Sequence, residues 1–319
     1  MSSVNTELLR QGNRRALAKA ITLVESKLDS HRQQAESLIE ALLPYSGNSV
    51  RIGITGIPGV GKSTFIENFG LYLIEQGKKV AVLAVDPSSP LAGGSILGDK
   101  TRMELLSRSD QAFIRPSPSE GALGGVAQKT RETMLLCEAA GYDVILVETV
   151  GVGQSEFQVA GMVDFFMVLM LPNAGDELQG IKKGIMELAD ALVINKADGE
   201  SLNLAQQTRQ HYQNAMHLLR QTSFWTPQVL TCSARENRNI DSVWGMISNY
   251  CVDARKNNAF TEKRARQNRE WMNTLLLEML TTKLKQNPRV RKAMPELERQ
   301  VVVSETTPYA AAKTLIEML

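Results

Sequence analysis

The stretch that decides the fold is Gly56-Ile57-Pro58-Gly59-Val60-Gly61-Lys62-Ser63. It follows a β-branched run at residues 50–55 and precedes a helical pattern at residues 64–76. A glycine-rich loop in this setting turns consecutive backbone N–H groups inward, and the start of the helix adds its dipole. We therefore predict a phosphate-binding loop (P-loop) for a nucleoside triphosphate. The predicted nucleotide-binding residues of this segment are Gly56, Pro58, Gly59, Val60, Gly61, Lys62, Ser63 and Thr64.

Two side chains of the loop carry the expected chemistry. Lys62 is placed to reach the β- and γ-phosphates, and the Ser63 hydroxyl can ligate Mg²⁺. Enzymes that hydrolyse such nucleotides act mainly by positioning a water and neutralising charge on the transferred phosphoryl group. Lys62 is therefore the first candidate catalytic residue.

Six further short apolar runs follow the loop and alternate with helical patterns such as residues 126–140. The runs occupy residues 79–85, 112–114, 143–147, 165–170, 191–194 and 228–231. Several lack polar alternation, which is typical of strands covered on both faces. We predict an α/β domain with a doubly wound, mostly parallel sheet over residues 46–255.

The two ends of the chain have helical patterns. Residues 1–45 predict a helical N-terminal extension, in which Asn13 caps a helix that begins at Arg14. Residues 256–319 are rich in charge and predict a helical C-terminal arm, whose last helix opens at Thr307-Pro308. Such an arm buries little apolar surface alone, so we expect it to pack on the α/β domain or on a second copy of itself.

Two later loops indicate which base is bound. Asp198, in Asn195-Lys196-Ala197-Asp198, follows a predicted strand and can accept hydrogen bonds from N1–H and the 2-amino group of guanine. The Lys196 stem can cover the ring. In Ser233-Ala234-Arg235 a backbone N–H could contact O6. These loops favour GTP over ATP, with an ordinary loop at 195–198 as the alternative.

Three acidic residues are candidates for a metal site. Glu148 ends a buried run, where a carboxylate is costly without a cation, so a metal ligand is favoured over a structural carboxylate. Gly151, three residues later, is the candidate sensor of the γ-phosphate. Asp86 ends the second strand and Asp99 lies in a glycine-bearing loop that nucleotide state could order. An Asx turn or a helix cap is the alternative for both.

Composition limits the remaining function classes. The chain has 319 residues, 36 Lys+Arg against 34 Asp+Glu, a net charge of +2 and 43% hydrophobic residues. These values exclude a disordered chain and a polyanion binder that relies on overall charge. The basic run at 289–292 fits a solvated helix face, so we expect no nucleic-acid partner. Three scattered cysteines and the absence of a long apolar stretch indicate a cytoplasmic protein with no membrane partner.

Three long motifs together resemble a known family. They are the P-loop, the stretch Gly93-Gly94-Ser95-Ile96-Leu97-Gly98-Asp99-Lys100-Thr101-Arg102-Met103 that follows Asp86-Pro87-Ser88-Ser89-Pro90, and Glu148-Thr149-Val150-Gly151-Val152-Gly153-Gln154-Ser155-Glu156. The chain resembles the methylmalonyl-CoA mutase-associated GTPases of the MeaB/ArgK type. The similarity covers nearly the whole chain and is weakest after about residue 255.

The resemblance implies a homodimeric GTPase that binds GTP and GDP with Mg²⁺ and dimerises through its C-terminal arm. The implied partner is an adenosylcobalamin-dependent acyl-CoA mutase, whose cofactor loading the protein gates and whose inactivated cofactor it helps to replace. Motif matching places Ser63, Asp86, Asp99 and Glu148 at or near Mg²⁺. It also makes Asp176, Gln179 and Lys182 a switch toward the mutase, and we expect hydrolysis to accelerate when the partner orders Asp99 and Lys182.

Three other readings remain open. A metal-insertion GTPase of the nickel type shares the glutamate at position 148 but needs clustered Cys or His ligands, which the sequence lacks. An ATPase or kinase of an arginine/ornithine transport system would have to use ATP, which the 195–198 loop disfavours. A module that binds nucleotide without hydrolysing it would be separated by product analysis.

Overall fold

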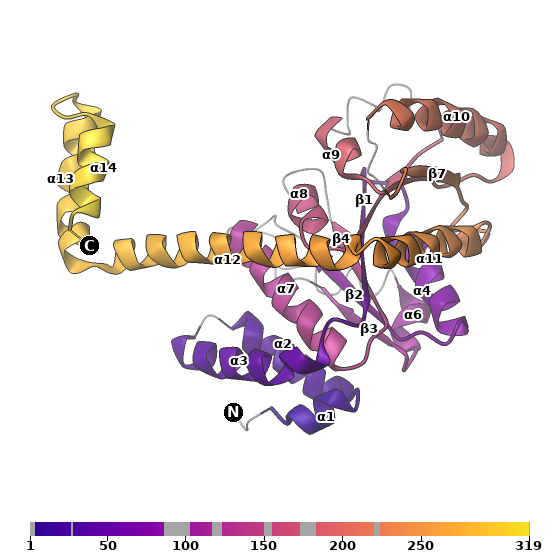
Figure 1. The fold of residues 1–319 in the computed structure, drawn as a ribbon, viewed down its shortest axis with the longest axis horizontal. Coiled ribbons are helices and arrows are strands. Elements are labelled where there is room, and N and C mark those ends of the chain that lie inside the picture. Colours follow the sequence, from indigo (N-terminus) through magenta and orange to yellow (C-terminus); the bar gives the residue numbers. More distant parts are fainter. Residues whose placement is uncertain are drawn as a thin grey trace. The chain divides into compact units, whose positions relative to one another are not determined.

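The computed structural model describes residues 4–26, 28–85, 103–116, 123–149, 155–172, 183–219 and 224–318. The contacts between residues divide the chain into two compact units, Met1–Arg264 and Ala265–Leu319. The first unit contains the sheet and the second is helical (Figure 1). Among the described residues, no helix combines the length and apolar character needed to cross a bilayer.

The sheet has seven parallel strands in the order β3-β2-β4-β1-β5-β6-β7. Their bounds are β1 Val50–Gly56, β2 Val80–Val85, β3 Ala112–Arg115, β4 Val144–Thr149, β5 Phe165–Met170, β6 Ala191–Ile194 and β7 Gln228–Thr231. Each strand falls on one of the seven predicted runs. The prediction of a doubly wound parallel α/β sheet is therefore confirmed.

Alternate residues of β4 enter different cores, because side chains of a strand point to opposite faces. Ile145 and Val147 of β4 join one hydrophobic cluster, while Val144 and Leu146 join the other. The first cluster is covered by α1 Thr6–Arg10, α2 Arg14–Glu25, α3 Asp29–Leu42, α7 Leu123–Ala139, α8 Ser155–Ala160, α9 Lys183–Leu188 and α10 Leu202–Leu219. The second is covered by α4 Lys62–Glu75, α6 Glu104–Arg108 and α11 Ile240–Lys256.

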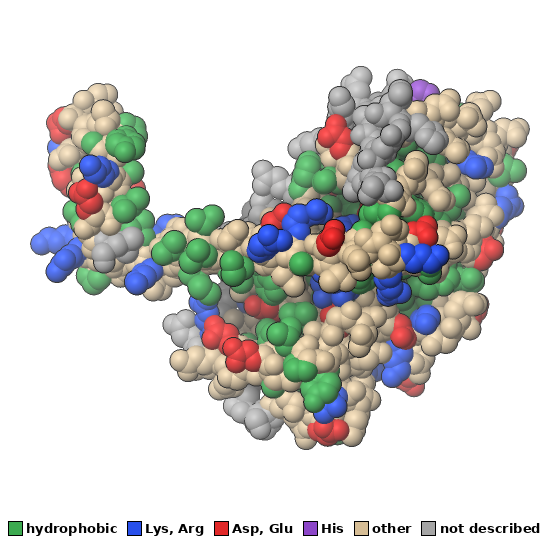
Figure 2. Space-filling view, in the orientation of Figure 1, with side chains coloured by type: hydrophobic (Ala, Val, Ile, Leu, Met, Phe, Trp, Pro, Cys, Tyr) green, Lys and Arg blue, Asp and Glu red, His purple; other side chains and the backbone are tan. Residues whose placement is uncertain are grey.

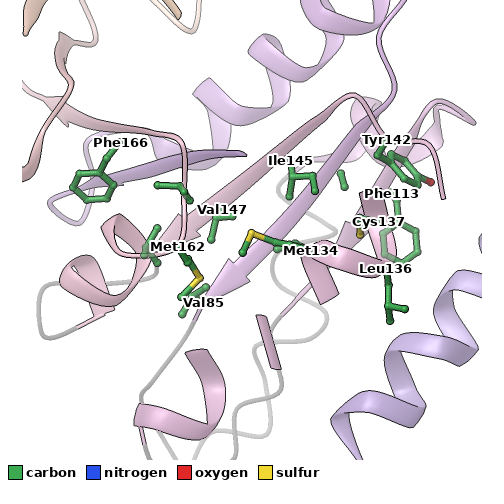
Figure 3. Close-up of a cluster of buried hydrophobic side chains, with 14 of the residues drawn as sticks. Val85, Phe113, Met134, Leu136, Cys137, Tyr142, Ile145, Val147, Met162 and Phe166 are labelled. Atoms are coloured by element: carbon green, nitrogen blue, oxygen red, sulfur yellow. The ribbon is translucent and has the colours of Figure 1, made fainter. Parts of the chain in front are cut away.

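Helix α7 links the N-terminal helices to the sheet. Its side chains Met134 and Cys137 lie in the cluster with Ile145 and Val147 of β4 (Figure 3). Helices α2 and α3 contact α7 and one another. Asn13 caps α2 as predicted, its side chain accepting a hydrogen bond from the Ala16 N–H at 3.0 Å. The short helices η1 Leu43–Tyr45 and η3 Gly199–Ser201 complete the connections of this unit.

A buried ion-pair network closes the amino-terminal edge of the sheet. Arg264 donates to both carboxylate oxygens of Asp164, at 2.7 and 2.6 Å, and also to the carbonyls of Gly47 and Ser49. Arg51 of β1 donates a backbone hydrogen bond to Asp164 at 2.8 Å. Asp164, directly before β5, is 1% exposed. The network therefore joins the segment before β1, the start of β5 and the last residues of the first unit.

Substitution of Asp164 by asparagine is expected to lower the free energy of unfolding by about 3 kcal/mol, because it removes the charge partner of the largely buried Arg264 at 2.6 Å and leaves only the more distant carboxylate of Glu138, at 3.9 Å. Urea unfolding measures this loss. Asp110→Asn is the matched control: Asp110 pairs with Arg14 at 3.4 Å but its side chain is 96% exposed, so the loss should stay below about 1 kcal/mol. Equal losses in the two variants would contradict this account of the network.

Helix α12 Ala259–Gln286 begins in the first unit and extends into the second, which also contains α13 Pro288–Val302 and α14 Pro308–Ile316. Helices α13 and α14 contact each other, and Asn287 before α13 donates to the Met318 carbonyl at 3.2 Å. Helix α14 begins at Pro308 as predicted, and Thr307 caps it by accepting a hydrogen bond from the Ala310 N–H. Among the described residues of this unit, the buried apolar side chains are Val290 and Ala311. The helical character of the C-terminal segment is confirmed, and its core is small.

Candidate functional site: a nucleotide site at the carboxyl edge of the sheet

The P-loop lies where the strand order changes direction. Strand β1 ends at Gly56 between β4 and β5, and α4 begins at Lys62. The chain leaves β1 toward β2 on one side of the sheet and later leaves β4 toward β5 on the other. A crevice at such a point, outside the carboxyl ends of parallel strands, is where open α/β sheets bind ligands.

The loop needs glycine at two positions for steric reasons. Gly61 has φ +93°, and a Cβ there would lie 2.8 Å from Asn195 Nδ2. A Cβ on Gly56 would lie 2.6 Å from the Leu169 carbonyl oxygen on the neighbouring strand β5. The tight turn brings the first N–H groups of α4 to the loop, where they lack partners within the helix and can bind an anion.

Lys62 is folded over the loop. It is 8% exposed, and its Nζ donates to the Gly56 carbonyl at 2.7 Å and to the Ile57 carbonyl at 3.3 Å. Burial lowers the pKa of Lys62, while the negative charges of Glu148 and Glu156 oppose that shift. The two hydrogen bonds to the carbonyls hold the ammonium group of Lys62 over the loop that is predicted to receive the phosphates.

Two buried carboxylates act on this lysine. Glu148 is 5% exposed in β4, and its neighbours across the strands are Ile54 of β1 and Ala84 of β2. Glu156 is 1% exposed in the first turn of α8. Glu156 ends the motif that begins at Glu148, but the sequence alone predicts no role for it. Its position at the start of a helix just after the predicted γ-phosphate sensor was the available signal.

The loop at residues 195–198 is attached to the P-loop. Asn195 Nδ2 donates to the Val60 carbonyl at 2.9 Å, and Lys196 Nζ donates to the Gly59 carbonyl at 2.7 Å. Lys196 has φ +58°, in the left-handed region. Ser233 donates its hydroxyl hydrogen bond to the Asp198 carboxylate. The segments predicted to bind phosphate and base thus form one hydrogen-bonded assembly.

The described candidate residues all lie at or directly after the carboxyl ends of four strands. After β1 are Gly56, Pro58, Gly59, Val60, Gly61, Lys62, Ser63 and Thr64; Glu148 is in β4; after β6 are Asn195, Lys196 and Asp198; after β7 are Ser233, Ala234 and Arg235. The other candidates, Asp86, Asp99, Gly151, Asp176, Gln179 and Lys182, lie outside the described residues.

The cysteines do not form a metal centre in the described part of the chain. All three are buried and free, and burial raises the pKa of Cys232 to about 12 and that of Cys251 to about 11. Within the described ranges, no group of three or more His, Cys, Asp or Glu side chains gathers around a common point. Ser63 and Glu148 offer hydroxyl and carboxylate oxygens beside the P-loop, the donor type that Mg²⁺ takes.

Comparison with known proteins agrees with this geometry. The sequence profile described as Methylmalonyl Co-A mutase-associated GTPase MeaB matches residues 17–289. The GTPase ArgK of Escherichia coli is 55% identical over 265 residues, covering 83% of this chain and 80% of that protein. The mitochondrial methylmalonic aciduria type A homolog of Mus musculus is 45% identical, covering 97% of this chain and 77% of that protein.

A solved structure extends the likeness to three dimensions. The crystal structure of a protein described as LAO/AO transport system kinase superposes with a TM-score of 0.78 at 43% identity, covering 98% of this chain and 95% of that one. Relatives of high identity and coverage are named as GTPases, among them a putative GTPase of Caulobacter vibrioides that is 54% identical over 306 residues. The prediction of a GTP hydrolase is confirmed. The chain belongs to the MeaB family of methylmalonyl-CoA mutase-associated P-loop GTPases.

Proposed function

We propose that this GTPase acts as a chaperone of an adenosylcobalamin-dependent acyl-CoA mutase, namely methylmalonyl-CoA mutase. The observation that carries the proposal is the match of residues 17–289 to a family described by its association with that mutase. The methylmalonic aciduria type A homolog, which aligns with 97% of the chain, adds support. In this role GTP binding and hydrolysis in the cytoplasm gate cofactor loading and the replacement of inactivated cofactor.

The proposed chemistry is hydrolysis of GTP to GDP and phosphate. Lys62 neutralises charge on the β- and γ-phosphates, and the N–H groups at the start of α4 hold the phosphate oxygens. Ser63 and Glu148, with Asp86 and Asp99, would hold Mg²⁺. Bound there, the metal would neutralise negative charge on the phosphates during hydrolysis. Gly151 is the proposed γ-phosphate sensor, and Asp99 and Lys182 complete the proposed catalytic set.

Guanine is the base proposed for the 195–198 and 233–235 loops. Asp198 accepts hydrogen bonds from N1–H and the 2-amino group, and the Lys196 stem covers the ring. The hydrogen bonds of Asn195 and Lys196 to the P-loop support a site in which base and phosphates are held together.

Signalling to the mutase is assigned to Asp176, Gln179 and Lys182. This segment lies between β5, which is next to the P-loop strand, and α9, which contacts α8. Since α8 begins with the motif residues Ser155 and Glu156, its contact with α9 supports a route from that motif to the helix that directly follows the segment in the sequence.

We expect purified methylmalonyl-CoA mutase from the same organism to accelerate GTP hydrolysis by this protein several-fold and to leave ATP unused. Phosphate release with each nucleotide, with and without mutase, measures the effect. Replacing Asp99, Gln179 or Lys182 with alanine should reduce the stimulated rate more than the unstimulated one. A GTP turnover that the mutase leaves unchanged would contradict the mutase assignment while the GTPase assignment stands.

The C-terminal arm is proposed to join two copies of the chain. Met272, Leu276, Met279 and Leu280 recur at helical spacing on one face of α12 and are 47–60% exposed. Figure 2 shows hydrophobic side chains along this helix. A helical unit with so few buried apolar residues gains most by covering such a face with a second copy.

Sedimentation velocity tests the dimer. The wild-type protein is expected to sediment as a dimer, and the double variant Leu276→Asp/Leu280→Asp as a monomer, because burying two carboxylates in an apolar contact is costly. Thr274→Asp, on the opposite face of α12 and also exposed, is the matched control and should remain dimeric. A double variant that stays dimeric would exclude this face as the contact.

A further inference from the structure

Asn68 connects the phosphate-binding helix to the loop after β7. It lies in the second turn of α4, which starts at Lys62 of the P-loop. Its Nδ2 donates to the Ala234 carbonyl oxygen at 2.8 Å. It also donates, over a longer distance of 3.2 Å, to the Thr64 carbonyl oxygen one turn earlier in the same helix. Asn68 and Ala234 are 166 positions apart in the sequence. No motif in the sequence singles out Asn68.

The Ala234 residue is held by hydrogen bonds on both sides. Its N–H donates to Asn195 Oδ1 at 3.0 Å, while its C=O accepts from Asn68. Ala234 and Asn195 are each 2% exposed. Asn195 in turn donates to the Val60 carbonyl of the P-loop. Two asparagines, one from α4 and one after β6, thereby fix the backbone of the 233–235 loop relative to the phosphate site.

The bond from Asn68 also sets the direction of the next N–H. A trans peptide unit is planar, and its C=O and N–H point in opposite directions. No peptide bond of the described chain is cis. By holding the Ala234 oxygen toward α4, Asn68 turns the N–H of Arg235 away from that helix. This N–H belongs to the loop proposed to face the C6 position of the base.

We propose that Asn68 is a specificity-determining positioning residue, which orients the Ala234–Arg235 peptide so that its N–H donates a hydrogen bond to O6 of guanine. The inference rests on the guanine reading proposed for the 195–198 and 233–235 loops. Guanine carries an acceptor at C6, whereas adenine carries an amino donor there, so a rigid N–H accepts one base and opposes the other. Asn68 makes no contact with the nucleotide in this scheme.

The test uses three nucleotides that differ in single groups. GDP has O6 and the 2-amino group, IDP keeps O6 but lacks the 2-amino group, and 6-thio-GDP replaces O6 with sulfur, a weak acceptor. Dissociation constants are measured by titration calorimetry on the full-length wild type and on Asn68→Ala. We expect affinity for GDP and for IDP to fall roughly tenfold, and affinity for 6-thio-GDP to change less than about twofold.

Two further variants complete the design. Asn68→Gln keeps an amide donor and should recover part of the lost GDP affinity, while Asn214→Ala, an exposed asparagine of α10, should bind all three nucleotides like the wild type. An equal loss for all three nucleotides would reduce Asn68 to a general structural role, and no loss would exclude it from base recognition. Failure of the guanine reading itself would appear separately, as an unaltered base preference in a variant of Asp198.

Discussion

Replacement of Lys62 by alanine is expected to slow GTP hydrolysis by about a hundred- to a thousandfold. One preorganised donor to charge that develops in a transition state is typically worth that factor. Lys62 is such a donor, because its ammonium group is already held over the loop by the carbonyls of Gly56 and Ile57 before any ligand arrives. The rate of phosphate release at saturating GTP, compared between the variant and the wild type, measures the change.

The control is Lys19→Ala, which removes an exposed lysine of α2 on the N-terminal helices. It should hydrolyse GTP at the wild-type rate. A Lys62→Ala protein that remains folded, binds GTP and turns it over within a few-fold of wild type would show that another group carries the phosphate charge. The variant also removes the positive charge next to the buried carboxylates Glu148 and Glu156, so its folding must be checked before its hydrolysis rate is interpreted.

The sheet could be predicted from the sequence because its signals are local. Strands covered on both faces read as continuous apolar runs: β5 is such a run, β4 is one up to Val147, and both are buried along their whole length. The cap at Asn13 was likewise readable, since a capping side chain bonds an N–H only three residues away, and Thr307-Pro308 indicated where the last helix begins. The P-loop follows from the same locality, because its chemistry is contained in eight consecutive residues.

Contacts between distant segments could not be read in this way. The hydrogen bond between Asn68 and Ala234 and the ion pair between Arg264 and Asp164 join residues 166 and 100 positions apart. Nothing in the local pattern of α4 distinguishes Asn68 from a solvated helix residue. Such partners are set by how the helices pack on the sheet, which one sequence does not determine.

Asp198→Asn is expected to change the preference of the protein from GTP toward xanthosine triphosphate by a factor of about 10⁴. The carboxylate offers two acceptors to the N1–H and 2-amino donors of guanine. Asparagine offers one acceptor and one donor, which match the N1–H and 2-oxo groups of xanthine. The ratio of kcat/KM for the two nucleotides measures the change, with Asp241→Asn of α11, an exposed acid, as control.

The hydrogen bond between Ser233 and residue 198 is expected to persist after this substitution, so the variant tests base recognition and not loop structure. Ser233 donates to the Asp198 carboxylate, and an asparagine at 198 still offers this hydroxyl either an oxygen acceptor or an amide donor, so the loop keeps a hydrogen bond. A variant that loses activity with both triphosphates equally would mean that Asp198 acts mainly by holding Ser233. A gain with xanthosine triphosphate instead requires that Asp198 touches the base. Only in that case does the peptide held by Asn68 lie beside the C6 position of the same ring.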